Sequence, residues 1–60
     1  MVQLDHADLS GANLEGVHAA YADFTDATMR GCLLSGAKLA NARLVGAGLD
    51  DADLTGADIK

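Results

Sequence analysis

One five-residue unit is written twice in the stretch Ala7-Asp8-Leu9-Ser10-Gly11-Ala12-Asn13-Leu14-Glu15-Gly16. The unit consists of Ala, a small polar residue, Leu, a polar residue and Gly. It returns near the end of the chain as Ala52-Asp53-Leu54-Thr55-Gly56, and weaker copies fill the residues between. Internal repetition at a fixed period is typical of repeat architectures, so this unit decides the fold.

Two positions of the unit stay apolar along the whole chain. The central position is filled by Leu4, Leu9, Leu14, Ala19, Phe24, Met29, Leu34, Leu39, Leu44, Leu49, Leu54 and Ile59. Two residues earlier is a small position, filled by Val2, Ala7, Ala12, Val17, Ala22, Ala27, Cys32, Ala37, Ala42, Ala47, Ala52 and Ala57. We expect the core to consist of the central residues other than Ala19, together with Ala7, Ala12, Ala22, Cys32 and Ala52.

A period of five fits neither of the common elements. On an α-helix the Leu side chains would spiral around the axis, and on a flat strand they would alternate between the two faces. Every Leu can point inward only if the chain turns once per unit, after a short extended piece. Residues that tolerate such corners occupy the last position of most units, namely Gly11, Gly16, Asp26, Gly31, Gly36, Asn41, Gly46, Asp51 and Gly56.

Four units at about 90° each would close one coil and stack residue n on residue n+20. This register places Gly16, Gly36 and Gly56 in one corner column. It also places each base except Lys60 next to an acid, in the pairs Asp23–Arg43, Arg30–Asp50 and Lys38–Asp58. Opposite charges on neighbouring strands favour this register.

Composition limits the classes of protein that fit. Sixty residues with no proline and no linker indicate one domain, 1–60, with no cap, and a chain of this length buries only about 60% of its extended surface. Nine acids and four bases give a net charge of −5, which argues against nucleic-acid binding. A single cysteine, no signal peptide and no apolar run long enough for a membrane span favour the cytoplasm.

The units Ala-Asp-Leu-Ser-Gly, Ala-Asn-Leu-Glu-Gly and Ala-Asp-Leu-Thr-Gly resemble the A(D/N)LXX unit of pentapeptide-repeat proteins, a family widespread in bacteria. The poorest units are 17–21, 27–31, 32–36 and 47–51. The resemblance implies an all-β fold, a right-handed quadrilateral parallel β-helix (solenoid) of about three coils of four pentapeptides. Three coils would extend roughly 14 Å along the axis.

The sequence contains no Ser-His-Asp set, phosphate-binding loop or nucleotide-binding motif, so we expect a function without catalysis. We predict a scaffold that mediates protein–protein interaction. The alternative is a DNA-mimicking binder of a type II topoisomerase, because some longer members resemble a DNA duplex in shape and charge. This chain is much shorter, and Arg30, Lys38 and Arg43 interrupt its acids.

Individual side chains point to no enzyme, metal site or cofactor. Cys32 occupies an inward position and is interpreted as a buried, inert thiol. His6 would lie beside Asp26 at a corner, but zinc sites need three or four ligands and no third is present. The acids and amide that follow the inward Ala are expected to be solvated or to hydrogen-bond within turns; they are Asp8, Asn13, Asp23, Asp53 and Asp58.

The remaining outward positions offer few candidates for contact with a partner. His18 would lie beside Lys38, and Leu33 and Val45 are scattered apolar residues of a kind normal at surfaces. Tyr21, in a corner column with Met1 and Asn41, is a candidate contact point.

The end coils would each leave a row of unpaired backbone groups and an open apolar end, which repeat proteins normally cover with caps. We therefore expect the chain to self-associate through its coil ends or to form part of a longer array.

Overall fold

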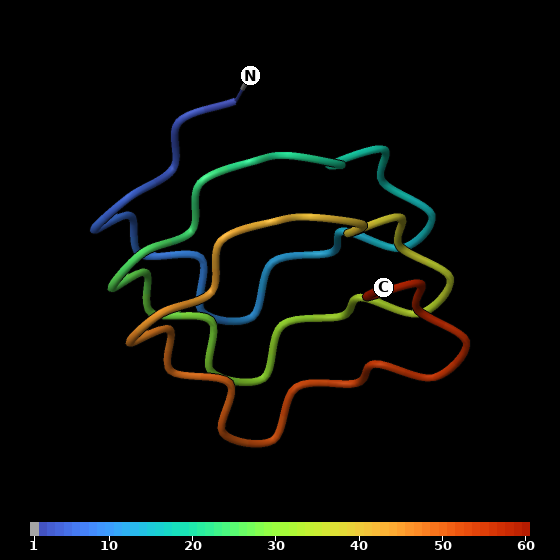
Figure 1. Ribbon diagram of the computed structural model, residues 1–60. Helices are drawn as coiled ribbons and strands as arrows, with labels where there is room; N and C mark the ends of the chain where they lie inside the picture. Colours follow the sequence, from blue (N-terminus) through green and yellow to red (C-terminus); the bar gives the residue numbers. More distant parts are fainter. Residues whose placement is uncertain (1) are drawn as a thin grey trace.

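The computed structural model describes residues 2–60, which form a β-helix of three stacked coils (Figure 1). Within this range there is no helix, and the pairing of strands is confined to single bridged residues. All the bridges are parallel and join residues twenty apart: Gln3–Asp23, Asp8–Thr28, Asn13–Leu33, His18–Lys38, Asp23–Arg43, Thr28–Gly48, Leu33–Asp53 and Lys38–Asp58. The predicted stacking of residue n on residue n+20 is confirmed.

Each unit ends in a tight turn closed by one hydrogen bond. Ala37 N donates to Leu34 O at 2.9 Å, and equivalent bonds recur along the chain. The third residue of every turn has a positive φ, which is typical of a type II turn. Six of these eleven residues are glycines with φ of 67–72°, and the other five, with φ of 59–66°, are His6, Tyr21, Asp26, Asn41 and Asp51. The corners expected from the sequence are therefore confirmed.

Three of the five N–H groups in a unit of the middle coil bond to neighbouring coils. Leu34 N and Gly36 N donate to the third coil, at 2.8 Å to Asp53 O and 2.9 Å to Thr55 O, while Leu33 N donates back to Ala12 O at 2.9 Å. Since each coil is hydrogen-bonded along all its units, the register is held by the backbone and does not depend on particular side chains. The shortest extent of the protein is 14 Å, in agreement with three coils at the usual strand separation.

The core is concentrated in the middle coil. Its buried central residues are Phe24, Met29, Leu34 and Leu39, each at most 2% exposed, and its buried residues at the small position are Ala22, Ala27, Cys32 and Ala37. Ala19, a central residue of the first coil, is also buried although it was not expected in the core. The central Leu residues of the outer coils are mostly half-buried and pack against this cluster, as do Ala12, Val17, Ala42 and Ala47. Burial therefore falls from the middle coil towards both ends.

Two residues expected in the core are exposed. Leu54 is 37% exposed and Ile59 is 62% exposed, although both occupy the central position. Both lie in the third coil, and no described coil covers its far side. Ala7 and Ala52, in the outer coils, are half-buried for the same reason. Across residues 2–60 there is no helix of the length and apolarity that would cross a membrane.

Candidate interaction surface

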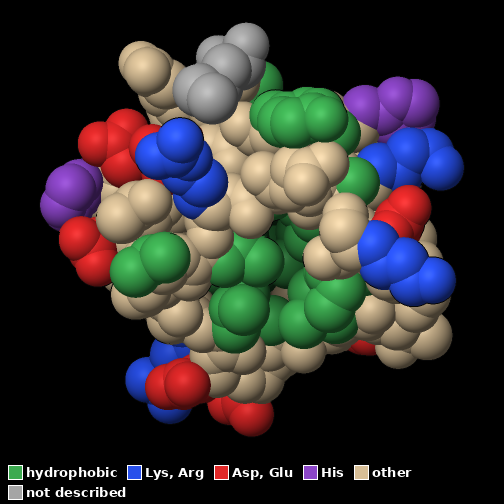
Figure 2. Space-filling model, viewed as in Figure 1, with side chains coloured by type: hydrophobic (Ala, Val, Ile, Leu, Met, Phe, Trp, Pro, Cys, Tyr) green, Lys and Arg blue, Asp and Glu red, His purple; other side chains and the backbone are tan. Residues whose placement is uncertain are grey.

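No pocket is found among the described residues, and the outer surface and the coil ends are considered in turn. That surface consists of four columns of bridged residues separated by corners. Figure 2 shows hydrophobic side chains gathered at the centre of the face in view, with charged side chains around the edge.

The small polar residue of the repeat satisfies a backbone donor inside its own unit. Wherever this position is Asp or Asn, its Oδ1 accepts a hydrogen bond from the N–H two residues later. The distances are 3.1 Å for Asp8–Ser10, 3.1 Å for Asn13–Glu15, 2.9 Å for Asp23–Thr25, 3.0 Å for Asp53–Thr55 and 3.3 Å for Asp58–Lys60. This is the Asx-turn pattern, so these side chains support the turn.

The same contacts lower the pKa of three carboxyl groups. The side-chain hydrogen bond from Thr25, followed by the backbone N–H of Thr25, lowers the pKa of Asp23, and the more distant Arg43 adds a smaller effect. Ser10 lowers the pKa of Asp8 and Thr55 lowers that of Asp53 in the same way. The sequence analysis predicts that these acids accept hydrogen bonds within turns, but it does not predict the additional hydrogen bonds from the Thr hydroxyl groups. The spacing Asp-x-Thr is the signal that would identify them.

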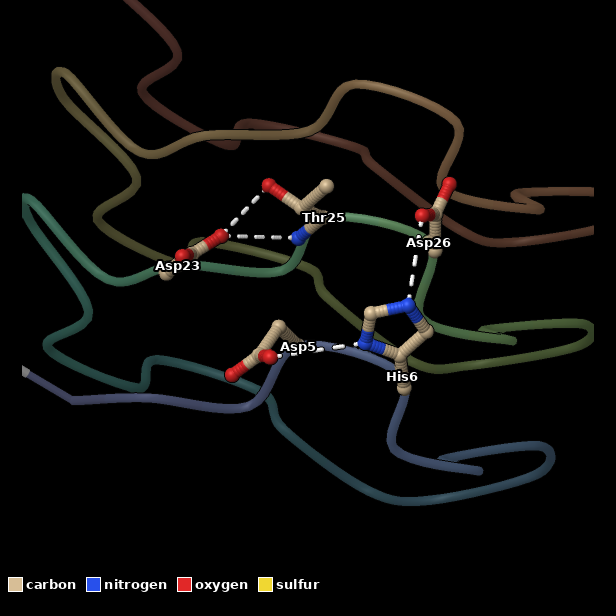
Figure 3. Close-up of polar contacts among 5 residues, drawn as sticks. All are labelled: Asp5, His6, Asp23, Thr25 and Asp26. Atoms are coloured by element: carbon tan, nitrogen blue, oxygen red, sulfur yellow. Dashed lines mark hydrogen bonds and ion pairs between the residues drawn. The ribbon is translucent and has the colours of Figure 1, made fainter.

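His6 lies between two carboxylates at one corner (Figure 3). Its Nδ1 is 3.4 Å from Asp5 Oδ2, and its Nε2 is 3.4 Å from Asp26 Oδ2. His6 and Asp26 are therefore neighbours at this corner, as predicted. All three side chains are open to solvent, and no group of three ligands suited to a metal ion occurs among residues 2–60.

The charge pairs expected from the register are neighbours without being in contact. Asp23 bridges to Arg43 and Lys38 bridges to Asp58, yet no Lys or Arg nitrogen of residues 2–60 lies within 4.0 Å of a carboxylate oxygen. Long side chains on an exposed face gain little from being held in one geometry. Among residues 2–60 no bridge joins two acids, so the bridged columns hold no continuous acidic stripe.

Cys32 lies in the core as expected, with no exposed surface. Burial raises the pKa of its thiol, which keeps it in the less reactive protonated form.

Tyr21 departs most clearly from the repeat pattern. Its side chain is 60% exposed, and its φ is 66°, a conformation that a bulky L-residue rarely adopts. Tyr21 N donates to Ala40 O at 2.9 Å, and the adjacent corner residues Ala20 and Ala40 are too small to cover an aromatic ring. Asn41 lies in the same column, whereas Met1 is outside the described residues. Leu33 and Val45 are also exposed, at 40% and 75%, but they lie in different columns.

Comparison with known proteins identifies the repeat. The family model for Pentapeptide repeats matches eight copies over residues 2–36 and 32–60. Among curated proteins no significant match is found.

Two solved structures resemble the chain. The first is a pentapeptide repeat protein (Rfr23) from the cyanobacterium Cyanothece 51142, with a TM-score of 0.68 and 28% identity, over 97% of this chain and 43% of that one. The second is HetL from Nostoc sp. strain PCC 7120, a pentapeptide repeat protein involved in heterocyst differentiation regulation. It has a TM-score of 0.53 and 34% identity, over 92% of this chain and 31% of that one. The chain thus spans less than half the length of either structure. Because the family model covers residues 2–60 and the structure repeats in the same register, the chain belongs to the pentapeptide-repeat family.

Proposed function

We propose that this chain is a non-catalytic protein-binding module whose partner contacts the corner formed by Ala20, Tyr21, Ala40 and Asn41, here called the Tyr21 corner. The observation that carries the proposal is the exposed aromatic side chain of Tyr21 on a backbone with φ of 66°. Glycine occupies six of the equivalent corners without this strain. Strained residues cluster at functional sites, and Tyr is among the residues that dominate binding energies at interfaces.

The shape of the molecule supports binding rather than catalysis. Residues 2–60 have no pocket that could enclose a substrate, and the one cluster of titratable groups described above, His6 with Asp5 and Asp26, lies open to solvent. The ring of Tyr21 is exposed at a corner whose adjacent residues, Ala20 and Ala40, are small, so it is accessible to a groove on another protein.

We also infer that the coil is right-handed and four-sided. Four turns occur in each twenty residues of register, which supports four sides. The handedness rests on the resemblance to the family, and an experimental structure would test both features.

The binding proposal is tested by affinity capture with two matched variants. Tyr21→Gly removes the ring and relieves the backbone, whereas Asp51→Gly relieves a backbone of similar φ at a corner in another column and leaves the Tyr21 corner intact. We expect wild type and Asp51→Gly to retain the same partner from a bacterial lysate, and Tyr21→Gly to lose it. A partner that binds Tyr21→Gly with unchanged affinity would refute the role of this corner.

A further inference from the structure

We propose that copies of this 60-residue chain stack head to tail, so that the third coil of one copy docks on the first coil of the next with the twenty-residue register unbroken. The proposal concerns the ends of the coil and is independent of the Tyr21 corner. It rests on the hydrogen-bond pattern, the apolar surface and the charges of the two end coils.

The two ends carry complementary backbone groups. Within residues 2–60, the third coil has central and corner N–H groups without a backbone acceptor, on Leu44, Gly46, Leu49, Asp51, Leu54, Gly56 and Ile59. In the first two coils each such group donates to the carbonyl nineteen residues later, as Leu34 N does to Asp53 O. If a second copy continues the coil, the same offset directs these N–H groups to first-coil carbonyl groups of that copy. These carbonyl groups accept no described backbone bond, and they belong to Gln3, Asp5, Asp8, Ser10, Asn13, Glu15 and His18.

The reverse set of bonds matches as well. In the middle coil, Leu33 N donates to Ala12 O, twenty-one residues earlier. The equivalent N–H groups of the first coil have no backbone partner among the described residues, and they belong to Gln3, Asp8, Asn13 and His18. The same offset directs them to third-coil carbonyl groups of the neighbouring copy that accept no described backbone bond, those of Ala42, Ala47, Ala52 and Ala57. In the twenty-residue register, the two rows of donors named above are therefore matched by the two rows of acceptors.

The apolar surfaces of the two ends fit each other in the same register. Leu54 and Ile59 are 37% and 62% exposed at one end, and Val2 is 50% exposed at the other. Stacking places Leu54 over Leu14 of the next copy and Ile59 over Ala19, the smallest of the central residues. In the second of these contacts, the large side chain of Ile59 therefore meets the small side chain of Ala19.

The charges also permit the contact although both end coils are acidic. The column that joins His18 to Lys38 and Lys38 to Asp58 would continue from Asp58 to His18 of the next copy. Asp53 would meet Asn13, and Asp50 would meet Ser10. No acid faces an acid in any column, which removes the main electrostatic obstacle to stacking.

The size of the contact predicts a weak, open assembly. The two longer extents of the protein, 24 and 23 Å, bound the end face, so a stacked pair buries roughly 1,100 Å² in total, near the lower limit for a specific interface. A head-to-tail contact along one axis does not close into a ring, and it therefore produces rods whose length rises with concentration.

The first test compares two Leu→Lys variants with nearly equal exposure in the structure. Leu54, at 37%, faces the open end, and Leu33, at 40%, faces outward from the middle coil. Sedimentation velocity and light scattering over the micromolar range should show rods for wild type and Leu33→Lys. Leu54→Lys would bury an ammonium group at the junction, so its association should weaken by at least about tenfold. Circular dichroism checks that each variant keeps the wild-type spectrum.

The second test uses engineered cysteines and reports the direction of stacking. Residues 18 and 58 are two coils apart within one copy, which is too far for a disulfide, but they would be neighbours across the junction at about 4.8 Å. The double variant His18→Cys/Asp58→Cys should therefore form covalent ladders under mild oxidation. Each single variant should remain uncrosslinked in head-to-tail rods.

A folded wild-type monomer throughout the micromolar range would overturn the proposal. Covalent dimers of Asp58→Cys alone would also overturn it, because they would show tail-to-tail contact. If Leu54→Lys loses its fold, Ile59→Lys at the more exposed end position replaces it, and equal association of that variant and Leu33→Lys would count against the proposal.

Discussion

Asp23 Oδ1 accepts two hydrogen bonds from Thr25, one from the backbone N–H at 2.9 Å and one from Oγ1 at 2.6 Å (Figure 3). Asp53 and Thr55 repeat the arrangement at 3.0 and 2.6 Å. The Asp of the repeat therefore stabilises the turn that follows it. The hydrogen bonds from Thr25 and Thr55 in turn lower the pKa of Asp23 and Asp53.

This relationship predicts how stability depends on pH. The folded-state pKa values of Asp8, Asp23 and Asp53 lie below the ordinary value of 3.8. Their contribution to the free energy of unfolding is therefore complete above that pH, and it is lost as the pH falls through the lower folded-state values. Replacing all three with Asn keeps an acceptor but removes the titration, so the melting temperature should fall less steeply below about pH 4.

Thermal unfolding followed by circular dichroism at a series of acidic pH values measures this effect. Asn13 shows that the amide is accepted at this position, with its own 3.1 Å bond to Glu15 N. Asp51→Asn, at a corner outside these turns, is the control and should keep the wild-type slope. A triple variant with the same slope as wild type would show that the turns do not govern acid sensitivity.

The loss in the free energy of unfolding when a central Leu is replaced with Ala should depend on the coil in which that Leu lies. Leu34 has no exposed surface, whereas Leu54 in the same column is 37% exposed. Leu34→Ala leaves a cavity and should reduce the free energy of unfolding by about 3 kcal/mol, a large part of the total stability of a small domain. Leu54→Ala should cost about 1 kcal/mol, because its side chain is already partly in water. Urea unfolding measures both, and equal losses would contradict the gradient of burial.

Backbone strain predicts different effects on stability for two corner substitutions. Gly36 has a φ of +68°, and an added Cβ would meet nothing within 4 Å. Gly36→Ala therefore changes only the backbone, and it should destabilise the protein by about 1 kcal/mol. Asn41→Gly, at φ of 61°, should be close to neutral, because glycine removes strain but increases the entropy of the unfolded chain. A stability of Gly36→Ala equal to that of wild type would show that these corners are unstrained.

The thiol of Cys32 should be inert in the folded protein. It has no exposed surface, and burial raises its pKa. A water-soluble thiol reagent should react with it only after denaturant unfolds the chain. Cys32→Ala should cost about 1 kcal/mol, since it removes one buried atom from a packed column. Rapid labelling under native conditions would contradict the burial.

The amino-acid sequence by itself determined the inside of the coil. A period of five with apolar residues at two positions leaves one way to direct every Leu inward, and the corner residues mark where the chain has to turn. The twenty-residue register was also predictable, because the Gly columns and the charge pairs agree on it.

Only the tertiary structure decided how these positions differ from one another. Leu34 and Leu54 are equivalent in the repeat, but their burial depends on whether a coil lies on each side. Asp23 and Arg43 are neighbours in the register, yet they make no ion pair, because solvent competes for both side chains. The exposed ring of Tyr21 and the complementary rows of free N–H and C=O groups at the two ends likewise follow from stacking, since a local repeat cannot specify which of its copies lies at an edge.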